Sequence, residues 1–497
     1  MKHYLGIDIG TFESKGVLVD ESGEIVASAS KPHKMLVPQP GWAEHRPRED
    51  WWGDFTFISR RLLAESGISP SSVRAVGASA IGPCMLPVDR DGEPLMNAVL
   101  YGVDARAAKE IDELTTRIGE ATLLDRCGNA LTSQSVGPKI LWLKRNRPEI
   151  FAKTHKILTS TSYLVHRLTG HWVIDHYTAA NTSPLYLADE LAWSDELADD
   201  IVDLDRLPDI RWTTDVAGGV SLRAAEETGL AAGTPVIVGT VDAAAEALSV
   251  GVLDSGDMML MYGSTIFIVM ITAARVRDPR LWYAPWLFPG QHASLSGLAT
   301  SGTLTHWFRD QFARDLGEDA FAKLAAEAEG SPPGANGLVV LPYFSGERTP
   351  IHDPHARGVV FGLNLTHTRG DLYRALLEGI AAGTNRIFET YLEAGQNPRQ
   401  ILAVGGGTRN RVWAQATSDM SGRTQIVRAR TVGASYGDAF LAALAVGDVK
   451  RETIREWNPV ATEIVADPAN AAAYARQYEV FRDLYPATKA LMHRLDG

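Results

Sequence analysis

The chain has 497 residues, which is too many for one hydrophobic core, so its length predicts two or more domains. Hydrophobic residues make up 45% and charged residues 22%, as in an ordinary globular protein. The net charge of −12 argues against nucleic acid or an anionic membrane as the main partner. Only Cys84 and Cys127 occur, so neither a disulfide framework nor a thiolate metal site is expected, and the acidic start MKHYLGIDIG does not resemble a signal peptide. We therefore expect a cytoplasmic protein.

The first notable stretch is 5–19, LGIDIGTFESKGVLV, which predicts two strands joined by a tight polar turn. Asp8 lies inside the first strand, where a carboxylate needs a cation or several donors to offset its lost hydration. The turn contributes Gly10, Thr11, Ser14 and Lys15, which together have the chemistry of a phosphate-binding loop. We expect Asp8 to bind Mg²⁺ and the turn to bind phosphate. The alternatives are an acid paired with a Lys or Arg and a solvated hairpin.

Further elements follow along the first half of the chain. The pattern predicts a strand at 24–30, a helix from about 47–51 to 65, a strand at 73–79, helices at 105–118 and 137–146, and irregular structure at 171–183. The end of the strand at 73–79 is followed by small residues that we expect at the edge of a cleft. The substrate candidates here are Ser79, Ala80, Ile81 and Gly82.

A buried strand at 235–239, PVIVG, leads directly into Asp242 and a helix, AAAEALSVG. The helix N-terminus favours the ionised carboxylate and the strand holds it still. We expect Asp242 to accept the proton of a substrate hydroxyl, because positioning the nucleophile is the main requirement in phosphoryl transfer. The alternative for Asp242 is an ordinary helix N-cap.

The second half begins after a Gly-Ser-Asp cluster at 253–257, so we expect domains at 1–252 and 253–497. At 258–271, MMLMYGSTIFIVMI, two apolar strands flank Gly263, Ser264 and Thr265, which repeats the pattern of the opening stretch. The duplication predicts a second phosphate loop facing the first. The run 258–274 is apolar enough to suggest a membrane span, but its turn and its length favour buried strands.

Strands and helices continue to alternate, which predicts layered α/β structure in both halves. The expected elements are a Gly/Ser region at 294–302 that includes Gly302, a helix at 304–312, a strand at 338–344, a helix at 371–395, a strand at 401–407, a helix at 411–420, a strand at 424–427, a helix at 433–445 and one or two capping helices from about 449. The run Gly405, Gly406, Gly407 and Asn410 predicts a strand-to-helix turn against which a nucleoside could lie. A plain turn leading into a helix is the alternative.

The paired loops resemble those of the actin, sugar-kinase and heat-shock ATPase superfamily, and neither a G-x-x-x-x-G-K-[ST] nor a G-x-G-x-x-G motif is found in their place. More specifically, the sequence resembles the FGGY carbohydrate kinases. The matching segments, which run in the family's order, are LGIDIGTFESKG, PGWAEHRPREDWW, KILWLKRN, GTVDAAAEALSVG, GERTPIHDPHARGVVFGL, DLYRALLEGIA, AVGGGTRNRVWAQATSDMSG and VGASYGDAFLAAL.

The resemblance implies an α/β fold with two ribonuclease-H-like domains around a nucleotide cleft, ATP with Mg²⁺ as cofactors, and phosphorylation of a sugar or polyol hydroxyl. It also implies that Asp242 is the base, that Asp8, Thr11, Lys15 and Ser264-Thr265 lie near metal and phosphates, and that 405–407 and Asn410 lie near the nucleoside. A homodimer is common in such families.

The substrate is less clearly indicated by the sequence. At 79–83 the chain reads SAIGP, where xylulokinase-like members carry Gln-Met-His and glycerol-kinase-like members an Arg-Glu pair. The segment YGVDAR, with Asp104 and Arg106, and the segment PGWAEHRPREDWW favour a xylulokinase-like member acting on a ketopentose. Phe267 is a candidate to pack on the carbon face of a small polyol, and a strand core residue is its alternative. Kinases of glycerol, tetritols or other ketoses are the further alternatives, together with a non-catalytic, actin-like nucleotide switch.

Overall fold

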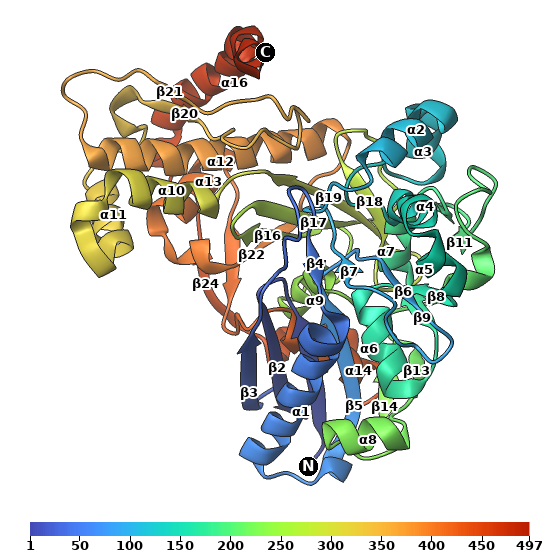
Figure 1. Cartoon of the computed structure of the whole chain (residues 1–497). Helices are drawn as coiled ribbons and strands as arrows, with labels where there is room; N and C mark the ends of the chain where they lie inside the picture. The colour runs from blue at the N-terminus through green and yellow to red at the C-terminus, as the bar shows by residue number, and fades with distance from the viewer. Residues whose placement is uncertain (497) are drawn as a thin grey trace.

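The computed structural model describes residues 1–496, which form two mixed β-sheets with helices packed on them (Figure 1). The N-terminal sheet has the order β13-β14-β5-β1-β2-β3, and β15 also pairs with β5. Its strands are β1 (His3–Ile9), β2 (Glu13–Asp20), β3 (Ile25–Pro32), β5 (Val73–Ala80), β13 (Val216–Gly219), β14 (Pro235–Ile237) and β15 (Thr240–Val241). β1 runs antiparallel to β2 and parallel to β5, so the first predicted hairpin lies at the centre of this sheet.

The C-terminal sheet has the order β18-β19-β17-β16-β22-β23-β24. Its strands are β16 (Asp257–Tyr262), β17 (Ile266–Thr272), β18 (Trp282–Pro285), β19 (His292–Leu298), β22 (Gln400–Val404), β23 (Gln425–Arg428) and β24 (Val460–Ile464). The hairpin β16–β17 is antiparallel and β16 is parallel to β22, as β1 is to β2 and β5. The two sheets therefore share one connectivity, which confirms the predicted α/β fold and its duplication.

The two sheets are joined through a common hydrophobic core. It contains Tyr4 and Val17 from the first sheet, Met259 and Leu402 from the second, and Phe440 from α14 (Ala434–Ala445). Although α14 comes late in the chain, it packs against β1, β5 and α9 (Asp242–Ser249). A Cβ on Gly6 would lie 1.9 Å from the carbonyl oxygen of Ser435, so glycine is needed where α14 crosses β1.

The longest helix is α12 (Arg369–Glu393), which crosses the upper part of Figure 1. It begins with a capping box, in which the Thr368 hydroxyl accepts from the Asp371 backbone N–H and the Asp371 carboxylate accepts from the Thr368 N–H. The other helices of seven residues or more are α1 (Gly53–Ser66), α2 (Ala108–Ile118), α3 (Glu120–Arg126), α4 (Val136–Asn146), α6 (Ser160–Thr169), α8 (Leu222–Thr228), α10 (Gly302–Phe312), α11 (Ala320–Glu329), α13 (Arg411–Ser421) and α16 (Ala471–His493).

Shorter elements complete the described chain. The short strands are β4 (Glu44–His45), β6 (Leu86–Val88), β7 (Ala98–Val99), β8 (Lys156–Leu158), β9 (Val173–Asp175), β10 (Tyr186–Leu187), β11 (Ala192–Trp193), β12 (Asp209–Arg211), β20 (Val339–Leu341) and β21 (Val359–Phe361). The short α-helices are α5 (Pro148–Lys153), α7 (His176–Ala179) and α15 (Ile454–Trp457), and a π-helix at Pro47–Trp52 precedes α1.

Two expectations from the sequence are wrong, and one region had been given no element. The segment from 449 onward contributes an edge strand, β24, besides its helices. The segment at 171–183, expected to be irregular, contains β9 and α7. The Gly/Ser region at 294–302 contains β19, whose small residues fit a strand that pairs with both β17 and β18. These elements could not be predicted from hydrophobic periodicity, because small or polar residues dominate their sequences.

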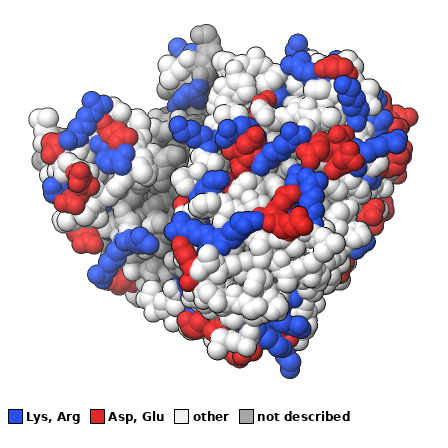
Figure 2. Space-filling view, turned by 60° about the horizontal axis from the view of Figure 1, so that its bottom comes forward, with Lys and Arg blue, Asp and Glu red and all other residues white. Residues whose placement is uncertain are grey.

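The helices and the surface charge of the described chain have the following properties. Among the helices of residues 1–496, none has both the length and the apolar character required to cross a bilayer. The apolar run at 258–274 instead contains the hairpin β16–β17. On the face shown in Figure 2, basic and acidic side chains lie interspersed.

Candidate active site

A cavity of about 770 Å³ is lined by residues from both halves of the chain. Asp8 and Lys15 come from the first hairpin, Glu246 from α9, and Gly405 and Gly406 from the turn after β22. The remaining lining residues are Ser249, Val250, Val404, Thr408, Arg409, Arg411, Ala414, Gln415, Val427, 431–434 and 462–465. Of the predicted site residues, the cavity therefore brings together Asp8, Lys15, Gly405 and Gly406.

The first predicted phosphate loop is the turn between β1 and β2. Lys15 lines the cavity and forms an ion pair with Glu13 at 3.3 Å. The hydroxyl of Thr11 lies 3.0 Å from that of Tyr101. The hydroxyl of Ser14 is buried and donates to Asp54 at 2.8 Å, so it supports the turn from within the protein.

The second predicted phosphate loop, Gly263, Ser264 and Thr265, is the turn between β16 and β17. It is fixed by the start of α10, because the carbonyl of Gly263 accepts from the Gly302 N–H at 3.0 Å and from the Ser301 hydroxyl at 2.9 Å. A Cβ on Gly302 would lie 2.5 Å from that carbonyl oxygen. Gly302 thus permits the close approach of α10 to this loop.

The glycines after β22 form the predicted strand-to-helix turn. Gly405 has a φ of +91° and a Cβ there would lie 2.6 Å from the Tyr262 carbonyl oxygen, so the position suits glycine. The 3₁₀ turn Gly406–Arg409 follows. Asn410 caps α13 by accepting a hydrogen bond from the Trp413 N–H at 3.1 Å. This role is structural and does not depend on a ligand.

Three half-buried carboxyl groups interact beside the cavity. Burial raises the pKa of Asp242 to about 6, although the Ala243 N–H, which donates to it at 2.7 Å, opposes the shift. Burial and then the charge of Asp242 raise the pKa of Glu246 to about 7, against the effect of Lys15. Burial, followed by the charges of Asp242 and Glu246, also raises the pKa of Asp8. A bound cation would reduce the mutual repulsion of these three carboxylates.

Ser79, predicted to contact substrate, lies between two acids. Its hydroxyl is 3.2 Å from Asp8 Oδ1 and 2.7 Å from Asp438 Oδ2. Asp438 comes from α14, is fully buried, and its pKa is raised by that burial. The packing of α14 on β5 therefore connects Asp438 to Asp8 through one hydroxyl.

Ala80, Ile81 and Gly82 continue from β5 beside α9. Ala80 and Ile81 are buried, the Ile81 N–H donates to the Ile9 carbonyl at 2.9 Å, and a Cβ on Gly82 would lie 2.5 Å from Val241. Phe267 is half-buried on β17 and packs against the shared core. These four predicted substrate residues therefore do not line the cavity described above.

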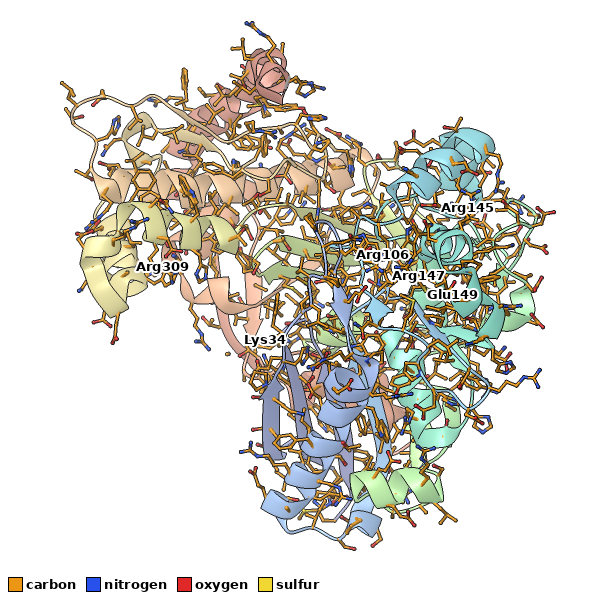
Figure 3. The ribbon with its side chains drawn as sticks, in the orientation of Figure 1. Lys34, Arg106, Arg145, Arg147, Glu149 and Arg309 are labelled. Carbon is orange, nitrogen blue, oxygen red and sulfur yellow. The ribbon has the colours of Figure 1, made fainter. Side chains whose placement is uncertain are left out.

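Asp104 and Arg106, also predicted to bind substrate, are engaged with other protein groups. Arg106 lies inside the N-terminal half (Figure 3) and pairs with Asp104 at 2.8 Å and Glu44 at 2.9 Å. Its guanidinium stacks on Trp42 at 3.9 Å, and Asp104 also accepts from the Ala43 N–H at 2.7 Å. Both side chains are fully buried.

Several residues of the site were missed by the sequence analysis. Glu246 could have been found, because it lies four residues after Asp242 and therefore on the same helix face. No sequence motif pointed to Asp438, Arg409 or Arg411. Glu347, which does not line the cavity, was not singled out either; it is buried, and it accepts from the backbone N–H groups of Ala299 and Arg348, both at 2.7 Å.

Comparison with known proteins gives a consistent result. The N-terminal domain model of the FGGY family of carbohydrate kinases matches residues 3–249, and the C-terminal domain model matches 258–446. The xylulose kinase of Escherichia coli K12 is 30% identical over 98% of this chain and 100% of its own length, and that of Bacillus subtilis is 29% identical over 99% and 98%. The crystal structure of xylulose kinase from Rhodospirillum rubrum superposes with a TM-score of 0.93 at 32% identity, covering 99% of this chain and all of that one. The chain therefore belongs to the FGGY family of carbohydrate kinases.

Proposed function

We propose that this kinase transfers the γ-phosphoryl group of ATP to a hydroxyl of a ketopentose, with xylulose as the first substrate to test. The observation that carries the proposal is the position of Asp242 at the first turn of α9, where it interacts electrostatically with Asp8 and Glu246, two residues that line the shared cavity. The end-to-end similarity to xylulose kinases supports the choice of sugar.

In the proposed reaction the substrate oxygen attacks the γ-phosphorus, its proton passes to a carboxylate oxygen of Asp242, and the bond to ADP breaks. The Ala243 N–H donates to Asp242 and fixes the orientation of the carboxylate before substrate arrives. Lys15 lines the cavity and would neutralise phosphate charge. Closure of the two halves around the ligands would exclude water and so prevent hydrolysis of ATP.

The acidic residues beside the cavity fit Mg²⁺. Their donors are carboxylate oxygens, which Mg²⁺ prefers, and it commonly binds through one or two carboxylates together with substrate phosphates and water. Among residues 1–496, no cluster of three or more His, Cys, Asp or Glu side chains that could hold a metal is found. Asp8 would hold the ion, which when bound supplies positive charge to the phosphate oxygens.

The first experiment is ADP release from Mg·ATP with a panel of pentuloses, hexuloses, tetritols and glycerol, for the wild type and Asp242→Asn. Asparagine keeps the shape and removes the base, so the rate with the responsive sugar should fall by about 10²–10⁴, while ATP binding measured by calorimetry is retained. If no compound stimulates ADP release and both proteins hydrolyse ATP equally, the catalytic role of Asp242 is refuted and the nucleotide switch is favoured.

Three further proposals accompany this function: a domain boundary at 252/253, a homodimeric state and a cytoplasmic location. The boundary is supported by the limits of the two family models. Sedimentation equilibrium will test the dimer. Fractionation of cells that express the native chain will test its location.

A further inference from the structure

The backbone of the first phosphate loop is held from behind by two histidines. His33 Nε2 donates to the carbonyl of Gly10 at 3.0 Å, and His45 Nε2 donates to the carbonyl of Thr11 at 3.1 Å. The backbone N–H of His33 donates to the carbonyl of Phe12 at 2.9 Å. Three consecutive carbonyl groups of the turn therefore point towards β3 and β4.

This arrangement fixes the direction of the loop's amide groups. In a planar trans peptide the C=O and the following N–H point in opposite directions. The N–H groups of Thr11 and Phe12 consequently point away from the two histidines, and neither donates a hydrogen bond to any group in the described part of the chain. Successive unpaired N–H groups of this kind form an anion-binding concavity.

The contacts also hold the His33 ring on both sides. Its Nδ1 lies 2.8 Å from the Asp54 carboxylate and its Nε2 faces the Gly10 carbonyl. The His33 side chain is 3% exposed, and Asp54 also pairs with Lys31 at 2.8 Å and accepts from Ser14.

His45 is the second ring of this pair. The indole N–H of Trp51 donates to His45 Nδ1 at 3.0 Å, so Nδ1 carries the lone pair and Nε2 the proton. Burial, together with the nearby charge of His33, lowers the pKa of His45 to about 4, and the two rings meet edge to face at 4.9 Å. The charged groups around the pair are Lys31, Glu13, Asp50 and Asp54.

We propose that His33, anchored by Asp54, and His45 are positioning residues that aim the amides of Thr11 and Phe12 at a phosphate of the bound nucleotide. The inference rests on the proposed function, because it concerns the ATP phosphates. Neither histidine touches the reacting atoms. Their contribution is to keep the loop in its binding conformation before ATP arrives.

The test measures binding of Mg·AMP-PNP by calorimetry to the wild type, His33→Ala, His45→Ala and His45→Gln. We expect each alanine variant to bind at least about tenfold more weakly, which is about 1.4 kcal/mol, and His45→Gln, whose side-chain amide can still donate, to recover most of the affinity. In steady state the KM for ATP should rise while the KM for the sugar changes little. His171→Ala, an exposed histidine on the same half, is the matched control.

Thermal melts identify any variant that fails to fold, and in that case His33→Gln replaces His33→Ala. Wild-type affinity in a folded His33 variant would overturn the inference alone. A wild type that binds no adenine nucleotide would overturn the proposed function and the inference with it.

Discussion

Replacing Gly302 with alanine should disturb the second phosphate loop while the fold survives. The new Cβ would lie 2.5 Å from the Gly263 carbonyl oxygen and 3.1 Å from its carbon, where ordinary contact begins at 3.4 Å. The loop must therefore retreat by about 0.9 Å or lose its hydrogen bonds to Gly302 and Ser301. Gly302 is the first residue of α10 and its φ lies outside the left-handed region, so alanine itself suits the helix.

The magnitude follows from this displacement. A misplacement of about 1 Å in a positioning element can cost about 10² in rate, whereas overpacking typically costs about 1–3 kcal/mol of stability. We expect kcat/KM for ATP to fall by about 10², with a modest decrease in Tm, in the ADP-release assay. Gly330→Ala is the matched control, because its Cβ would meet no atom closer than 3.4 Å. Unchanged kinetics in folded Gly302→Ala would refute the reasoning that this loop binds phosphate.

Two further predictions concern buried charge. Arg106→Met should lower the free energy of unfolding in urea by about 3–5 kcal/mol, because it leaves Asp104 and Glu44 without their cation. A variant of unchanged stability with only a raised KM for sugar would instead show a substrate-binding role. Burial raises the pKa of Glu347 to about 8, so the folded state retains a proton that the unfolded state releases above its ordinary pKa of 4.5. Stability should therefore fall as the pH rises from about 5 to 8, and Glu347→Gln should reduce this dependence; an identical pH profile of urea midpoints in the variant would contradict the raised pKa.

Much of the fold was determined locally by the sequence. The two hairpins could be predicted because apolar strand residues flank Gly, Thr and Ser clusters at 10–14 and 263–265, and these clusters favour turns whatever surrounds them. Asp8 and Asp242 could be identified because each is a carboxylate at the end or interior of an apolar strand, where burial demands a partner. The domain boundary and the roles of the individual site residues stay predictions.

Only the tertiary structure decided which distant groups meet. His33 and His45 reach the first phosphate loop because β3 and β4 lie beside it, and Asp438 reaches Asp8 because α14 crosses to the first sheet. Likewise, Arg106 is enclosed by Asp104 and Trp42. Local sequence fixes backbone preferences over a few residues, whereas contacts between segments depend on strand order and helix packing. For that reason the sequence alone could predict the two phosphate loops, whereas the contacts that hold the first of them became visible only in the structure.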